Sequence, residues 1–146
     1  MNQYSKLDNP SFWFWGVATL LLLWNSMGVA AYLTQVNLGA EALAELPEAQ
    51  RVLMENTPVW VTTAFAIAVF IGLMACIVLL LRFSLARLLF GVSLIAVLVQ
   101  NSYWWFFTNG IEVMGKTALF FPVLVILILL FSLWFCTSAK TKNWIR

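Results

Sequence analysis

Four long stretches without a charged residue dominate the pattern of apolar and polar positions along this chain. No other stretch free of Asp, Glu, Lys and Arg reaches half their length, and they cover residues 9–40, 56–81, 88–111 and 117–139. A helix needs about 20 residues to cross a hydrocarbon layer of about 30 Å, because each residue adds about 1.5 Å. The pattern therefore predicts four membrane-spanning helices, at about residues 12–33, 58–81, 87–107 and 117–137.

The composition agrees with this prediction. Hydrophobic residues make up 63% of the chain and charged residues 10%, whereas soluble globular proteins have about 45 to 50% and about 25%. The apolar run at 12–33 exceeds the core of a cleaved signal peptide, about 7 to 15 residues, so we expect a retained first helix. The expected fold is a single all-α membrane domain over residues 1–146, with four transmembrane helices in an antiparallel bundle.

Basic residues are divided unevenly between the two predicted sides of the membrane. One side carries Arg51 and Lys116 together with five of the six acidic residues. The other side carries six of the eight basic residues, namely Lys6, Arg82, Arg87, Lys140, Lys142 and Arg146. Since Lys and Arg gather on the cytoplasmic side, both termini are predicted to be cytoplasmic. Cys76 and Cys136 then fall near that reducing side and are expected to be free thiols.

Residues 35–56 form the only sizeable segment outside the predicted spans. Its Ala, Leu and Glu content favours helix, and Pro47 suits the first turn of a second short helix. We expect one or two amphipathic helices on the outer surface. Aromatic residues at 12–15 on the inner side and 103–107 on the outer side are predicted to be interfacial anchors.

The chain lacks the residues on which most catalysis and ion coupling depend. It has no His, and no Asp, Glu, Lys or Arg lies in the interior of a predicted span. This argues against haem ligation by His, proton relays and His-activated nucleophiles. We expect no enzyme activity, no cofactor and no metal. Glu41, Glu45 and Glu48 would share one face of a helix continuing through Pro47, where a solvated surface is favoured over a weak Ca²⁺ site.

Neutral polar residues within the spans provide a candidate binding site. Asn25 lies 13 residues after Phe12 and Gln100 lies 13 after Arg87, so both amides are expected about 20 Å above the inner boundary. Two polar stripes share one helical spacing: Asn25, Gly28, Tyr32, Gln35 and Ser93, Ala96, Gln100, Tyr103. The hypothesis is an outward-opening pocket for a small neutral solute, formed by Trp24, Asn25, Tyr32, Thr63, Gln100 and Tyr103. The alternative is that these groups only hold the helices together.

A ridge of small residues follows the second predicted helix in steps of four. It consists of Ala64, Ala68, Gly72 and Cys76. Small residues at this spacing let another helix approach closely. Packing within the chain is the favoured interpretation, and dimerisation through the ridge is the alternative.

Four segments carry a resemblance to a family. They are Leu-Trp-Asn at 23–25, the Ala- and Glu-rich run at 41–51, the Pro-x-Trp segment at 58–70 and Leu-Leu-Leu-Arg at 79–82. On these segments the chain resembles small four-helix bacterial membrane proteins that are often labelled sugar transporters. The resemblance covers nearly the whole chain. It implies a four-helix architecture in the bacterial inner membrane and supplies no catalytic residues.

Two functions fit these observations. The first is binding or passage of a small neutral, sugar-like solute near Asn25, Gln100 and Tyr103. Such a transporter is expected to be oligomeric, because a four-helix bundle is filled by its own side chains. The alternative is a structural or accessory subunit of a membrane complex. The expected partners are the lipid bilayer and further copies of the chain or another membrane subunit, and no nucleic acid.

Overall fold

The computed structural model describes residues 7–146, and its regular structure there is entirely helical. Lys6, one of the basic residues behind the predicted orientation, lies outside the described residues. The helical segments are α1 (Phe12–Val36), α2 (Ala40–Ala44), α3 (Glu48–Glu55), α4 (Val59–Leu80), α5 (Leu85–Ser102), the π-helical turn η1 (Tyr103–Phe107), α6 (Gly110–Met114), the 3₁₀ turn η2 (Lys116–Leu119) and α7 (Phe120–Thr141).

Four helical segments are long and apolar enough to cross a membrane. Their exposed surfaces carry many large apolar side chains, such as Leu20, Ile95 and Leu127. Such surfaces suit contact with lipid tails, and the chain thus has the helices of a multi-pass membrane protein. The segments overlap the four charge-free stretches and confirm their number within residues 7–146: Phe12–Val36, Val59–Leu80, Leu85–Phe107 and Lys116–Thr141.

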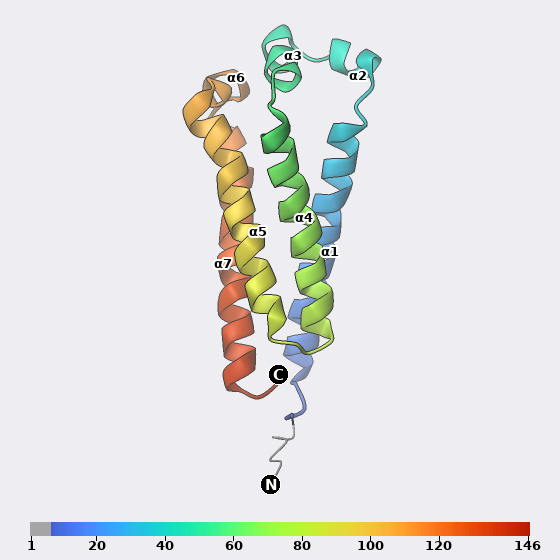
Figure 1. Ribbon diagram of the computed structural model, residues 1–146, viewed down its shortest axis with the longest axis vertical. Coiled ribbons are helices and arrows are strands. Elements are labelled where there is room, and N and C mark those ends of the chain that lie inside the picture. Colours follow the sequence, from blue (N-terminus) through green and yellow to red (C-terminus); the bar gives the residue numbers. More distant parts are fainter. Residues whose placement is uncertain (1–6) are drawn as a thin grey trace.

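The long helices lie side by side, with the short helices gathered at one end (Figure 1). We call the end with α2, α3 and α6 the capped end. The opposite end, where the α4–α5 turn lies beside the C-terminus, is the turn end (Figure 1). Helices α4 and α5 pair most extensively, α1 packs on α4, and α7 packs on α5. Helices α1 and α7 are not among the main packing pairs.

The buried side chains of α1 and α7 are concentrated at the turn end. Helix α1 buries side chains only as far as Leu21, and α7 only from Leu129 onward. Toward the capped end neither helix has a buried side chain, and the two diverge (Figure 1). The bundle is therefore closed at the turn end and less tightly packed at the capped end.

Phe14 belongs to this core, which corrects its prediction as an interfacial anchor. Its side chain is fully buried, whereas Phe12 is 91% exposed. The Phe14 ring stacks on Phe135 of α7 with centroids 5.7 Å apart, and Trp144 packs edge-on at 5.9 Å. The spacing of two residues turns Phe12 and Phe14 to different sides of α1, so only one of them can face the lipid.

The C-terminal residues complete the closure of the turn end. Ile145 is buried beneath the bundle. Arg82, in the α4–α5 turn, donates from Nε to the carbonyl oxygen of Trp144 at 2.7 Å, and its own carbonyl accepts from the Arg146 amide at 2.9 Å. These hydrogen bonds tie the tail across the ends of the helices.

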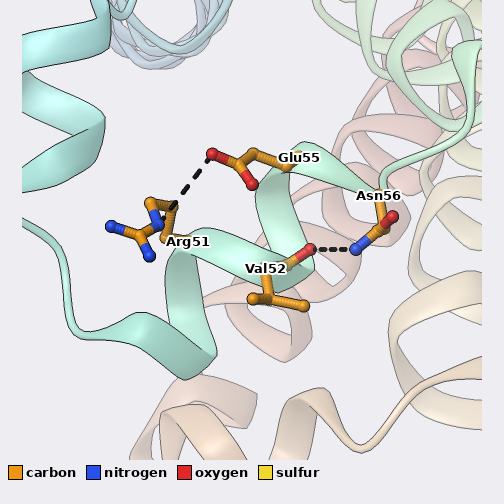
Figure 2. A network of polar contacts seen from close by, with 4 residues as sticks. All are labelled: Arg51, Val52, Glu55 and Asn56. Atoms are coloured by element: carbon orange, nitrogen blue, oxygen red, sulfur yellow. Dashed lines mark hydrogen bonds and ion pairs between the residues drawn. The ribbon is translucent and has the colours of Figure 1, made fainter.

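At the capped end, α3 is amphipathic, as the sequence predicts for this segment. Figure 2 shows the end of this helix, where Arg51 Nε pairs with Glu55 Oε1 at 3.9 Å. The Asn56 side chain donates to the Val52 carbonyl at 2.8 Å (Figure 2), which also accepts from the Asn56 amide at 3.1 Å.

The acidic residues of this segment do not share a helix face, contrary to the expectation for a helix continuing through Pro47. Helix α2 ends at Ala44, and α3 begins only at Glu48. Pro47 precedes α3 because its missing N–H cannot continue a helix. Glu41, Glu45 and Glu48 are all exposed, so the three carboxylates are solvated separately.

The last span also begins differently from its prediction as a continuous helix from residue 117. Gly115 takes a φ of 81°, which suits glycine, and the 3₁₀ turn η2 follows it before α7 begins at Phe120. Pro122 consequently lies in the first turn of α7, where a missing N–H needs no partner.

Candidate functional site

A cavity of about 550 Å³ lies between the helices at the capped end. Its walls come from α1, α4, α5 and α7, with η1, α6 and η2 around them. The cavity lies above the core of the turn end, where α1 beyond Leu21 and α7 before Leu129 bury no side chain. Its volume falls within the range of about 300 to 1,000 Å³ that is typical of small-molecule sites.

The lining of this cavity is neutral and partly polar. No charged residue is among the side chains that form it, so an ion would find no compensating charge there. Aromatic rings line it from several helices: Trp24, Phe65, Trp104, Trp105 and Phe121. Five polar side chains reach it from α1 and α5: Asn25, Gln35, Ser93, Gln100 and Asn101.

Asn25 and Ser93 lie deep in the cavity and link α1 and α5 to α4. Asn25 Nδ2 donates to the Leu21 carbonyl at 2.9 Å and to Cys76 Sγ at 3.3 Å. Ser93 Oγ donates to the Ala68 carbonyl at 2.7 Å. Because these donors are satisfied within the fold, both residues stabilise helix packing in addition to shaping the cavity.

Gly72 provides the space in which these two polar side chains meet α4. A Cβ built on Gly72 would collide with Asn25 Oδ1 and lie 3.1 Å from Ser93 Oγ. Gly72 is therefore required by its neighbours and not by its own backbone conformation.

Gln100 and Gln35 are the polar lining residues best suited to hold a ligand. Asn101 is buried and uses its Nδ2 to donate to the Val97 carbonyl at 2.8 Å. Within residues 7–146, by contrast, the amides of Gln35 and Gln100 form no hydrogen bond to the protein, although both line the cavity. Their donors and acceptors are available to a bound molecule.

Three of the six predicted site residues line the cavity. They are Trp24, Asn25 and Gln100. The two amides line the same cavity, as expected, but not at equal depth: Asn25 lies at the level of Ser93, and Gln100 is seven residues, about 10 Å, nearer the capped end. Trp24 also packs against Phe121 of α7 in a tilted arrangement, with ring centroids 5.9 Å apart.

The two predicted tyrosines lie outside the lining and pack against α4 and its start. Tyr32 meets Phe65 edge to face with centroids 5.4 Å apart. Tyr103 packs edge-on against Trp60 at 5.7 Å and donates its hydroxyl to the Asn56 carbonyl at 3.3 Å. Both rings therefore fix helix contacts, and neither lines the cavity.

Thr63 is likewise outside the lining. It is exposed, and its hydroxyl donates to the Val59 carbonyl of the preceding turn at 2.9 Å. Val61 and Ala64 belong to the buried face of α4, and Thr63 points about 100° away from Ala64 around the helix. Its hydroxyl is satisfied by its own helix.

The two tyrosines of the polar stripes miss the cavity for different reasons. Tyr32 lies about 20° around α1 from the lining residue Asn25, but its ring turns to Phe65 and Phe70 of α4. Tyr103 is turned by about 80° around α5 from the lining residue Ser93. The cavity face of α5 follows the spacing i, i+4, i+7, i+8, i+11, formed by Ser93, Val97, Gln100, Asn101 and Trp104.

Sequence reasoning did not select Asn101, Trp104 or Trp105 for the site. Asn101 and Trp104 could have been found from the helical spacing that they share with Ser93 and Gln100. Trp105 has no such signal, because the π-helical turn η1 changes the direction of the residues that follow Ser102. π-Helical turns often occur at functional sites.

Helix α6 fixes Trp104 at the rim of the cavity. Thr108 Oγ1 donates to the Trp104 carbonyl at 3.1 Å and accepts from the Gly110 amide at 3.1 Å. A Cβ on Gly110 would lie 3.3 Å from Trp104 Cε3. The close approach of glycine thus lets α6 lie against the indole ring.

The small-residue ridge of α4 is buried by helices of the same chain. Ala64, Ala68, Gly72 and Cys76 are all buried, and α1 and α5 both pack on α4. A second chain therefore has no access to the ridge. Cys76 and Cys136 are both free, as predicted, and the structure buries both.

Comparison of the chain with models of known families, with curated proteins and with solved structures found no match. The structure alone therefore defines the class: a helical chain with four segments able to span a membrane and a neutral cavity at one end of them.

Proposed function

We propose that this protein binds a small uncharged solute in the cavity at the capped end and takes part in its transport. The observation that carries the proposal is a cavity of about 550 Å³ with no charged lining residue, in which the amides of Gln35 and Gln100 have no protein partner among residues 7–146. Aromatic faces with a few convergent polar groups suit an uncharged ligand. The proposed role is not catalytic.

The proposed arrangement is an antiparallel bundle in a bacterial inner membrane, with both termini cytoplasmic. The cavity would then open outward, and the turn end would face the cytoplasm. Because Phe14, Ile145 and their neighbours fill the turn end, one chain in this state offers a pocket and not a pore. Passage across the membrane would require rearrangement of this end, or assembly of several chains.

Cysteine labelling in intact cells tests this orientation. With a membrane-impermeant maleimide added outside, Gln50→Cys and Glu112→Cys are expected to react, because both sides of the capped end would face outward. Ser84→Cys and Lys142→Cys are expected to react only after the cells are opened. Labelling of Ser84→Cys from outside would overturn the proposed topology.

Ligand-induced stabilisation tests the binding site. Purified protein in lipid nanodiscs is titrated with uncharged probes: glucose, glycerol, benzyl alcohol and hexyl glucoside. At least one is expected to raise the unfolding temperature saturably, since a ligand at 100 times its Kd stabilises by about 2.7 kcal/mol. Gln100→Leu should abolish this rise while changing stability without ligand by about 0.5 kcal/mol or less.

Gln50→Leu is the matched control, because Gln50 lies on α3 and does not line the cavity. It should respond to the probes like the wild type. Absence of stabilisation by every probe, or stabilisation that survives Gln100→Leu, would contradict the proposed site.

A second candidate function is a non-catalytic accessory subunit of a membrane complex. The observation that favours it is the internal pairing of Asn25 and Ser93, which act as helix contacts. In that case the space between α1 and α7 would be filled by a helix of another subunit. The protein would then be expected to purify with that subunit in mild detergent, and the probes would not stabilise it.

A further inference from the structure

The side of the cavity between α1 and α7 differs from its other sides. Helix α4 packs against both α1 and α5, and α5 packs against α7, whereas α1 and α7 are not among the main packing pairs. Between α1 and α7 the boundary is formed at the level of the cavity by Trp24, Met27 and Phe121. We call these three residues the α1–α7 seam.

The seam is accessible from the surface that faces the lipid. Met27 is 66% exposed and Phe121 is 61% exposed, although both line the cavity. The contact between the Trp24 and Phe121 rings joins the two helices here. Met27 and Phe121 thus border the cavity without being covered by a neighbouring helix, and an opening of the cavity toward the bilayer is inferred at this place.

The cavity has few free hydrogen-bonding groups, and they lie at one end of it. The donors of Asn25, Ser93 and Asn101 are used by backbone carbonyls. Gln35 and Gln100 lie near the capped-end termini of α1 and α5. The lining that α7 contributes deeper in the cavity is apolar: Val125, Ile128 and Leu129.

This distribution favours one kind of molecule. A free sugar carries a hydroxyl on nearly every carbon, and each hydroxyl buried without a partner weakens binding. A molecule with one polar end and one apolar end would place the first at the two glutamines and the second along α7 and the seam. Its polar end would then lie toward the membrane surface and its apolar end toward the membrane interior.

Resting on the proposed solute site, we propose that its ligand is an uncharged amphipathic molecule that enters from the bilayer through the α1–α7 seam. The polar head binds to Gln100 and Gln35. The apolar portion lies against α7 and passes between Met27 and Phe121.

Glucose and hexyl glucoside test this inference because they share a head and differ in the apolar tail. Binding to the protein in lipid nanodiscs is measured by stabilisation of the folded state. Hexyl glucoside is expected to bind about tenfold tighter than glucose or more, since burying two methylene groups supplies that factor. Met27→Trp, which fills the seam, should weaken hexyl glucoside binding about tenfold by removing the same tail contacts.

Met74→Trp is the control, because Met74 is also exposed, at 51%, but lies on α4 away from the cavity. It should leave binding of both probes unchanged. Since Met27 is exposed, its substitution is not expected to prevent folding, and Phe121→Ala, which widens the seam, should speed release of hexyl glucoside.

The outcomes separate this inference from the proposed function. If glucose binds as tightly as hexyl glucoside and both need Gln100, the solute site stands and the amphipathic ligand is wrong. If hexyl glucoside binds selectively but neither seam variant alters it, entry through the seam is wrong. If neither glucose nor hexyl glucoside binds to the wild type, the inference fails. Binding of glycerol or benzyl alcohol would then still support the proposed solute site.

Discussion

Phe14→Ala is expected to lower the free energy of unfolding in detergent by about 3 kcal/mol, the low end of the range for truncating a buried phenylalanine. The ring is fully buried and joins α1 to α7 and the tail through Phe135 and Trp144. Removing it leaves a cavity in the buried core that α1 and α7 share at the turn end. Reversible unfolding of the purified protein, followed by circular dichroism against denaturant, would measure the change.

Phe12→Ala provides the comparison within the same helix. Phe12 is 91% exposed, so its truncation should change the free energy of unfolding by about 0.5 kcal/mol or less. Equal effects of the two substitutions would show that Phe14 is an interfacial anchor after all and would contradict the closed turn end.

Gly72→Ala is expected to destabilise the protein by about 1 to 2 kcal/mol, although alanine is intrinsically the better helix former. The added methyl group would occupy the place of Asn25 Oδ1 and crowd Ser93 Oγ. Asn25 would have to rotate and give up its hydrogen bonds to Leu21 and Cys76. The loss of these contacts outweighs the gain in helix propensity.

Gly91→Ala tests this explanation on the neighbouring helix. A Cβ at Gly91 meets nothing within 4 Å, so this variant should be neutral or more stable by up to about 1 kcal/mol. The two glycines should thus give changes of opposite sign or clearly different size in the same unfolding measurement. If Gly72→Ala stabilises as Gly91→Ala does, Asn25 does not occupy the position described.

The number and approximate position of the long helices could be predicted from charge alone. A charge within a bilayer is costly, so spans must avoid charged residues over about 20 positions, and this constraint needs no knowledge of packing. The helix ends were less predictable. Pro122 illustrates this, because a proline is compatible both with a kink inside a helix and with a first turn.

The presence of Asn25 and Gln100 in one cavity was predictable, whereas their relative depth was not. Counting about 1.5 Å per residue from the predicted inner ends put both amides at one level, but those ends are not level, and Asn25 lies beside Ser93, seven residues before Gln100. The direction in which a side chain points also depends on the neighbouring helices, and Tyr32 does not line the cavity for that reason. Its ring packs against Phe65 of α4.

The cavity itself could not be read from the sequence. It lies where α1 beyond Leu21 and α7 before Leu129 bury no side chain, and both helices remain apolar through that region. Apolar residues look the same whether they face lipid, a neighbouring helix or an internal space. The π-helical turn that brings Trp105 to the rim adds a local change of direction that side-chain periodicity does not encode.

The presence of an accessible cavity at Gln100 is tested most directly by thiol labelling at that position. Gln100→Cys and Ala96→Cys lie on the same helix, but Ala96 is buried outside the cavity lining. In lipid nanodiscs Gln100→Cys is expected to react with N-ethylmaleimide about tenfold faster than Ala96→Cys or more, because only a hydrated thiol forms the reactive thiolate readily. Labelling of the wild type gives the background rate, which should be low because both native thiols are buried. Equal, slow labelling of the two variants would show a closed interior at Gln100 and contradict the proposed site.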